Sequence, residues 1–180
     1  MQKFNQFIGH NRTAMSLLLA LIFLWLAKPT VTFILWGIPL IIFGEFIRTW
    51  SAGCINKEYE HLTIEGPYAY TRNPLYVGNF LLGIGFVIMG HHWIPFVLFL
   101  IFFFLIYRST ILDEENTLSR VFGQSFTDYK KRVPRFIPLI IPLSSPKFIF
   151  YWGRVFRHRE HKAWLGIAAV LIFIIIKSII

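Results

Sequence analysis

The sequence predicts an all-α integral membrane fold of about five transmembrane helices, with an amphipathic helix and connecting loops on the cytoplasmic side. Three observations predict it. Hydrophobic residues make up 56% of the 180 residues and the mean hydropathy is +0.58, too apolar for a soluble domain of this size. The apolar residues gather in separate spans, and most basic residues gather in one segment. The chain therefore belongs in a bilayer.

Five apolar spans are predicted, several of them shorter than the roughly 20 residues of a usual crossing. Residues 14–27 form the first span, which follows Lys3 and Arg12 as in a signal peptide, but no small-x-small cleavage site precedes Lys28. We therefore expect a retained helix. The other spans are 30–47, 75–90, 93–107 and 163–180.

A single membrane domain is expected over residues 1–180. Its parts are an N-terminal helix hairpin (1–50), a central core (51–138) and a basic linker with the C-terminal transmembrane helix (139–180). The core contains predicted helices 74–90 and 92–110 and an amphipathic helix 112–131.

The distribution of charge predicts the topology. Eleven of the 18 Lys and Arg residues lie between the fourth and fifth spans, and none lies between the third and fourth. The positive-inside rule then places the N-terminus, the 48–74 loop and the 108–162 segment in the cytoplasm, as in a bacterial inner-membrane protein. The basic run 130–138 is expected along the anionic leaflet, so membrane lipids are partners.

Two functional classes find no support in the composition. Despite a net charge of +9, no basic stripe or binding motif points to nucleic acid. Cys54 is the only cysteine, which excludes a disulfide framework and a cysteine-based zinc site, and no metal site is expected.

Residues 66–78, GPYAYTRNPLYVG, combine turn residues, aromatic rings and an arginine at the start of an apolar helix. Pro74 suits the first helical position, and Asn73 suits the cap before it. The free N–H groups of this helix end would face Tyr68, Tyr70 and Arg72, an arrangement that attracts anionic or electron-rich ligand groups. An interfacial aromatic belt is the alternative.

A second polar group lies in the predicted amphipathic helix. Apolar residues at 111, 118, 122, 126 and 129 follow helical spacing, and Glu114 and Glu115 lie on or beside that stripe. Carboxylates on a packed face cost several kcal/mol unless they find partners, which favours a polar pocket. The alternative is an acidic first turn that complements the helix dipole.

The first segment resembles the G-P-Y-x-Y-x-R-H/N-P-x-Y-x-G signature of the isoprenylcysteine carboxyl methyltransferase and phospholipid methyltransferase family. Residues 114–138 resemble the same family's E-E-x-x-L-x-x-x-F-G-x-x-Y/F-x-x-Y motif followed by R-V-P-R-F-I-P. The resemblance covers roughly residues 44–138. Asn73 stands where members acting on prenylated cysteine typically have histidine, Leu112 where many have a basic residue, and Phe126 replaces a common tyrosine.

The resemblance implies S-adenosyl-L-methionine bound at the cytoplasmic helix ends, with its methyl group facing a lipid-accessible cleft. It further implies that Glu114 acts in catalysis with Arg72 or Arg108, which would orient an acidic substrate. The cofactor-binding positions it implies are Glu60, His61, Leu62, Thr63, Tyr68, Asn73, Pro74, Leu75, Tyr76, Glu114 and Glu115.

The expected function is methyl transfer to a hydrophobic or lipid-anchored acceptor, a carboxylate of the prenylcysteine type. Three alternatives stay open: a lipid amine N-methyltransferase, a nicotinamide-dependent reductase of the sterol reductase type, and a non-enzymatic membrane protein. An ion path has little support, because Glu45 is the only acidic residue in the predicted spans. The sequence leaves the oligomeric state open.

Overall fold

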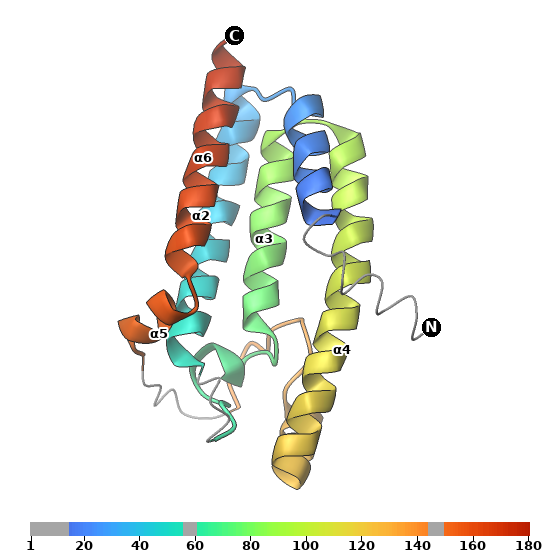
Figure 1. The fold of residues 1–180 in the computed structure, drawn as a ribbon, viewed down its shortest axis with the longest axis vertical. Helices are drawn as coiled ribbons and strands as arrows, with labels where there is room; N and C mark the ends of the chain where they lie inside the picture. Colours follow the sequence, from blue (N-terminus) through green and yellow to red (C-terminus); the bar gives the residue numbers. More distant parts are fainter. Residues whose placement is uncertain (1–14, 56–60, 144–149) are drawn as a thin grey trace. The chain divides into compact units, whose positions relative to one another are not determined.

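The computed structural model describes residues 15–55, 61–143 and 150–180, and in these ranges the protein is helical, without strands. The expected all-α fold is therefore confirmed (Figure 1). The helices are Met15–Leu26, α2 (Val31–Cys54), α3 (Pro74–Met89), α4 (Trp93–Arg132), α5 (Trp152–Arg157) and α6 (Glu160–Ile179), with a short 3-10 helix, η1, at Gly66–Ala69.

Three of these helices, α2, α4 and α6, are long and apolar enough to cross a membrane. Helix Met15–Leu26 and α3 are apolar but shorter, so the expected count of five crossings is not established. Large apolar side chains of the long helices are exposed, among them Trp36, Phe104 and Ile172. Such surfaces are stable in lipid and costly in water. The chain is an integral membrane protein.

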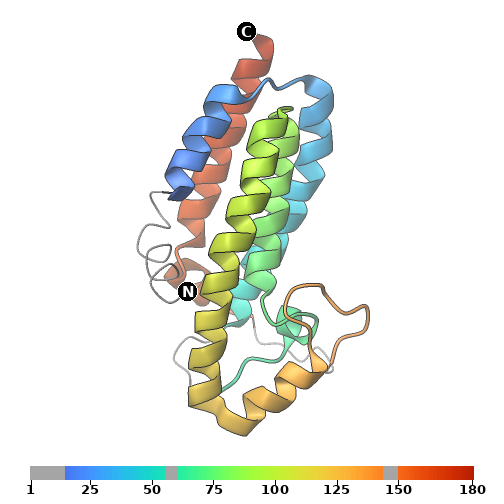
Figure 2. The same cartoon turned by 90° about the vertical axis from the view of Figure 1, so that its right-hand side faces the viewer.

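The boundary expected between helices 92–110 and 112–131 is wrong. Helix α4 continues through residue 111, and its backbone leaves helical geometry only at Gly123, where φ is 50° and ψ is −117°. Figure 2 shows α4 turning sharply in its gold-coloured C-terminal part. This conformation is open to glycine and strained for other residues. Glycine chemistry, rather than the change from apolar to polar residues, sets the break.

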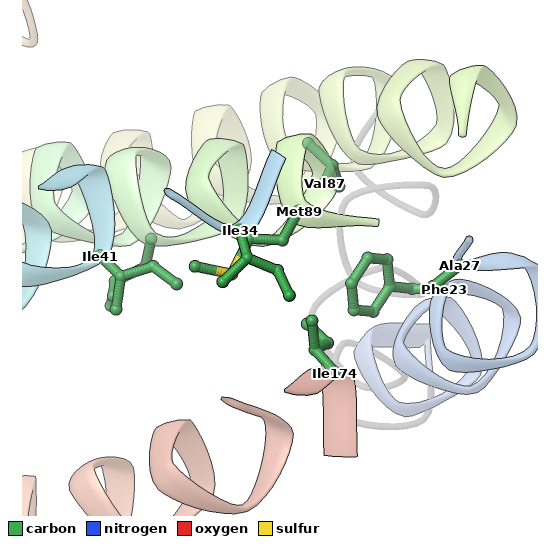
Figure 3. Packing of buried hydrophobic residues seen from close by; sticks show 8 residues of the cluster. Phe23, Ala27, Ile34, Ile41, Val87, Met89 and Ile174 are labelled. Carbon is green, nitrogen blue, oxygen red and sulfur yellow. The ribbon is translucent and has the colours of Figure 1, made fainter. Parts of the chain in front are cut away.

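The chain divides into two compact units. The first comprises residues 1–42, 80–113 and 167–180, and the second comprises 43–79 and 114–166. In the first unit, Phe23, Ile34, Met89 and Ile174 pack in one apolar cluster (Figure 3). Gly37 lets α2 approach α3 here, because a Cβ at Gly37 would lie 2.6 Å from the carbonyl oxygen of Gly85.

The second unit holds both motifs that the sequence singles out. Its apolar cluster is Phe126, Tyr129 and Val133, with Leu62, Ile64, Leu118, Phe122 and Leu143 packed against it. The last turns of α4 therefore supply the hydrophobic support on which the 61–79 segment rests. All site geometry described below lies in this unit.

Candidate active site

The 66–78 segment folds as two successive turns. Gly66, the first residue of η1, has a φ of 58°, which glycine adopts without strain, and Pro67 lies in the first turn of η1. The carbonyl of Asn73 then accepts bonds from the N–H groups of Tyr76 and Val77, at 3.1 and 3.2 Å, as a helix-capping residue does. Helix α3 thus begins at Pro74, as predicted.

Backbone groups of the 133–143 segment close over this turn. The Arg72 N–H donates to the Pro134 carbonyl at 2.9 Å, and the Leu139 N–H donates to the Tyr70 carbonyl at 2.9 Å. The side-chain amide of Asn73 donates to the Arg135 carbonyl at 2.9 Å. The two motifs are therefore joined by hydrogen bonds between residues about 60 positions apart in the chain.

The acid pair divides into two roles. Glu115 is 4% exposed and lies between two arginines: Arg72 Nη1 is 3.1 Å from its Oε1, and Arg135 approaches both oxygens, through Nε at 3.1 Å and Nη2 at 2.9 Å. A bidentate arginine–carboxylate pair is both strong and directional. Glu115 therefore ties the two motifs together.

Glu114, in contrast, accepts one hydrogen bond from the Tyr76 hydroxyl, at 3.1 Å, and lines two adjoining clefts. Its ordinary position beside Glu115 on the same helix hides this difference in the sequence. Glu115 also lines the first cleft, but two arginines pair with its carboxylate, so Glu114 is the carboxylate that a ligand can reach without displacing an ion pair.

Burial shifts the pKa of two side chains in this group. Desolvation lowers the pKa of the Arg72 guanidinium, with Glu115 acting in the opposite direction. Burial, followed by the nearby negative charge of Glu114, raises the pKa of the Tyr68 hydroxyl well above its usual range. Tyr68 is consequently a neutral hydrogen-bonding group at any physiological pH.

The first cleft includes about 660 Å³ of empty space when its solvent-open part is counted. The 61–63 segment, the η1 turn and α4 form its walls. Its lining residues are Ile55, His61, Leu62, Thr63, Tyr68, Arg72, Asn73, Glu114, Glu115, Leu118, Phe122, Phe126 and Tyr129.

The second cleft, of about 610 Å³ on the same basis, adjoins the first. Five residues line both clefts: Ile55, Tyr68, Arg72, Asn73 and Glu114. The remaining lining residues of the second cleft are Arg48, Pro74, Leu75, Tyr76, Asn79 and Glu160.

All but two of the residues predicted for the site line one cleft or both. Arg108 lines neither, is exposed, and belongs to the other unit. Glu60 lies outside the described residues. Sequence reasoning missed Arg48, Asn79 and Glu160. Arg48 had a signal, since a basic residue three positions after the intramembrane Glu45 invites pairing. Glu160 is a lone acid in a basic stretch and had none.

Several polar atoms in the first cleft lack a partner. Among the described residues, no group hydrogen-bonds the buried Tyr68 hydroxyl, the Thr63 hydroxyl or the Nε of Arg72. A buried polar atom without a partner costs about 1–3 kcal/mol. Hydroxyl groups and a carboxylate, set in an apolar and aromatic wall, fit the amino, hydroxyl and adenine groups of a nucleoside cofactor such as S-adenosylmethionine.

Comparison with known proteins identifies the class. The family model described as phospholipid methyltransferase matches residues 32–125, which covers α2, α3, most of α4 and both clefts' central residues. The chain belongs to this family, as its two motifs predicted.

The similar curated proteins include protein-S-isoprenylcysteine O-methyltransferases. The rat protein is 32% identical over 115 residues, 58% of this chain and 40% of its own length, and the Schizosaccharomyces pombe protein is 37% identical over 115 residues, 58% and 49%. A nickel-cobalt-cadmium resistance protein, NccN, of Alcaligenes xylosoxydans is 30% identical over 150 residues, 82% and 68%. The chain thus spans about half the length of these methyltransferases. No solved structure matches.

Proposed function

We propose that this chain is an S-adenosylmethionine-dependent methyltransferase of the membrane that transfers a methyl group to the carboxylate of a lipid-anchored acceptor of the prenylcysteine type. One observation carries the proposal. The hydroxyls of Thr63 and Tyr68, which have no hydrogen-bond partner in the described part of the chain, line the same cleft as the Glu114 carboxylate, and this cleft includes residues of both family motifs. The isoprenylcysteine O-methyltransferases among the relatives support the acceptor class.

The residues of the first cleft would hold the cofactor. Glu114 would accept hydrogen bonds from its amino or hydroxyl groups, with the Tyr76 hydroxyl fixing the carboxylate from behind. Tyr68, which is neutral and has no hydrogen-bond partner among the described residues for its hydroxyl, would donate to a cofactor oxygen or nitrogen. Leu62, Leu118 and Phe122 offer apolar surface for the adenine ring of the cofactor. Glu115, held by Arg72 and Arg135, would keep the two motifs in register.

S-adenosylmethionine supplies a methyl group activated by its positive sulfonium sulfur. A carboxylate oxygen of the acceptor forms the new C–O bond as the C–S bond breaks, and the electron pair of that bond stays on sulfur. No proton has to be removed, so no strong base is required. The chain's contribution is to align the two reactants and to exclude water.

The bilayer would hold the rest of the acceptor. Moving a prenyl or acyl chain from lipid to water costs about 0.8 kcal/mol per CH₂. The acceptor's tail should therefore stay among the membrane helices while its polar end reaches the clefts. This requires the site to lie at the level of the membrane surface.

The proposed orientation places both motifs in the cytoplasm, as in a bacterial inner-membrane protein, because the basic residues concentrate between residues 108 and 162. Single cysteines introduced in the 66–78 and 108–135 segments, in a Cys54→Ser background, test it. Membrane-impermeant maleimide should label them only after the membrane is opened. Labelling of intact cells from the outside would reverse the topology.

The function is tested with the purified protein in detergent. It is incubated with methyl-labelled S-adenosylmethionine and one of two acceptors, in separate reactions. The first acceptor is N-acetyl-S-farnesylcysteine, a prenyl carboxylate, and the second is total membrane lipid. We expect label in the prenyl carboxylate as a base-labile ester. Label only in the lipid amine fraction would replace O-methylation by N-methylation. Binding of NADPH without binding of S-adenosylhomocysteine would identify a reductase instead.

A further inference from the structure

Arg48, near the C-terminal end of α2, carries a network that the family motifs do not include. Its Nη2 donates to Glu160 Oε2 at 2.6 Å, its Nη1 donates to the side-chain oxygen of Asn79, and its Nε lies 3.3 Å from Glu45 Oε2. Three separate helices, α2, α3 and α6, thus meet at one guanidinium. Glu160 lies outside residues 32–125, the range matched by the family model.

The guanidinium of Arg48 retains hydrogen-bonding capacity. Arginine has five N–H donors, and the described residues take up two of them in hydrogen bonds, with Nε in ionic contact but without a hydrogen-bond partner. Arg48 also lines the second cleft. A planar guanidinium with N–H groups that are not yet hydrogen-bonded is suited to binding a carboxylate.

The other arginines of the unit's site are less suited to this task. Arg72 also lines the second cleft, but its guanidinium is buried against Glu115. Arg135 donates hydrogen bonds from its Nε and Nη2 to the same carboxylate, and it lines neither cleft. Both arginines are therefore paired with Glu115, which does not line the second cleft. Arg72 keeps Nε and Nη1 without hydrogen-bond partners among the described residues, but Arg48 is the arginine whose ionic partner, Glu160, lines the second cleft with it.

The position of the second cleft suits a lipid-anchored group. Its walls include the C-terminal end of α2, the first turns of α3 and the first residue of α6, together with residues of η1 and α4. Both α2 and α6 are long enough to span a membrane, so these helix ends belong at the level of lipid headgroups. A polar group whose tail stays in the bilayer would reach this depth directly.

We propose that the second cleft is the acceptor subsite, and that Arg48 binds the acceptor's carboxylate in competition with Glu160. This assignment rests on the proposed function. With Glu45 and Glu160 both beside Arg48, a third carboxylate would bring an excess of negative charge into a buried space. Glu160 must therefore give up its place on Arg48 as the acceptor binds. Asn79, which is uncharged, keeps the guanidinium in position.

The competition makes opposite predictions for two neighbouring substitutions. Arg48→Gln should raise the KM for N-acetyl-S-farnesylcysteine at least tenfold. Glu160→Gln, which keeps an oxygen for Arg48 but removes the competing charge, should lower that KM by a few fold. Neither should change the affinity for S-adenosylhomocysteine. A purely structural network would instead lower the melting temperature in both variants and shift KM in neither, or in both alike.

The carboxamide of the same prenyl compound isolates the charge. As a competitive inhibitor it should bind the wild-type protein at least ten times more weakly than the carboxylate, and Arg48→Gln should abolish this preference. Arg48→Lys, which keeps the charge without the fork, should retain part of it. Trp164→Phe is the matched control, since its Nε1 donates to Glu45 at 2.8 Å in the same network but Trp164 lines neither cleft.

Three outcomes separate the two proposals. A carboxylate preference that survives in Arg48→Gln and Glu160→Gln, with methyl transfer intact, overturns the acceptor subsite and leaves the proposed function standing. Failure to bind S-adenosylhomocysteine, or to methylate any carboxylate, overturns the proposed function and the subsite with it. If Arg48→Gln does not fold, the KM of Glu160→Gln decides: a KM that is unchanged or raised rejects the competition.

Discussion

Arg135 grips Glu115 with two parallel contacts, Nε to Oε1 at 3.1 Å and Nη2 to Oε2 at 2.9 Å. The Glu115 side chain is 5% exposed, whereas the Arg135 side chain is 45% exposed. The hydrogen bonds to Glu115 raise the pKa of Arg135, so this guanidinium stays charged. The segment that follows α4 is therefore bound back onto α4 through the contact between Arg135 and Glu115.

Glu115→Gln should destabilise the protein rather than act on ligand binding alone. Removing one partner of a buried ion pair costs about 3–5 kcal/mol, because the remaining charge is left without compensation. Here Arg72 is the buried partner, and Arg135 can turn toward water. We expect a lower midpoint of thermal unfolding in detergent. An unchanged midpoint would show that Glu115 does not join the two motifs.

Glu114→Gln should weaken ligand binding and leave the stability of the protein nearly unchanged. Its carboxylate has one side-chain hydrogen bond, from Tyr76, which glutamine can also accept. We expect the unfolding midpoint to stay within a degree or two, while the affinity for S-adenosylhomocysteine falls at least tenfold by calorimetry, as a charged hydrogen bond worth about 1.5–3 kcal/mol is lost. Unchanged affinity would remove Glu114 from the cofactor site.

Tyr68→Phe should separate binding from stability at a single hydroxyl. The Tyr68 hydroxyl has no partner among the described residues, so its removal should leave the stability of the ligand-free protein unchanged or slightly increased. Affinity for S-adenosylhomocysteine should fall about 3–10-fold, the equivalent of one hydrogen bond.

Tyr129→Phe is the control, because the Tyr129 hydroxyl donates to the Tyr68 carbonyl at 2.7 Å. It should cost about 1 kcal/mol of stability. If Tyr68→Phe destabilises the protein as much as Tyr129→Phe, the Tyr68 hydroxyl serves the fold rather than a ligand.

Alkaline pH should destabilise the protein partly through Tyr68. Its pKa in the folded protein is raised above the ordinary value of 10.0 by burial. The unfolded chain then loses this proton at lower pH than the folded protein does, so the contribution to stability is complete below pH 10 and is lost as pH rises further. The unfolding midpoint of the wild-type protein should fall more steeply above pH 10 than that of Tyr68→Phe. Parallel curves would contradict the burial of the hydroxyl.

Gly123→Ala should destabilise the bend of α4. An added Cβ would meet no atom within 4 Å, so the cost is conformational and arises from the φ of 50°. We expect a loss of about 1–2 kcal/mol. Gly153→Ala is the matched control, since a Cβ there also meets no neighbour and its φ is not positive. Equal stability of the two variants would argue against the bend.

Several features of this protein can be predicted from its sequence, because they depend on the chemistry of neighbouring residues. The apolar spans, the start of α3 at Pro74, and the polar character of the 66–78 and 114–138 segments follow from hydropathy, from proline's missing N–H and from side-chain type. These properties depend on residues close together in the chain. Twelve of the 19 residues that line the two clefts lie in the two motif segments.

Tertiary structure alone decided the rest, because the deciding interactions join distant residues. Glu114 and Glu115 are adjacent in the chain and chemically alike. Arg72 and Arg135 form ion pairs with Glu115, whereas Glu114 lines both clefts. Arg48 meets Glu160 across 112 positions, a pairing that no local pattern predicts. Sequence determines which groups a membrane chain must satisfy; the packing of its helices determines which partner satisfies each one, and which group is left for a ligand.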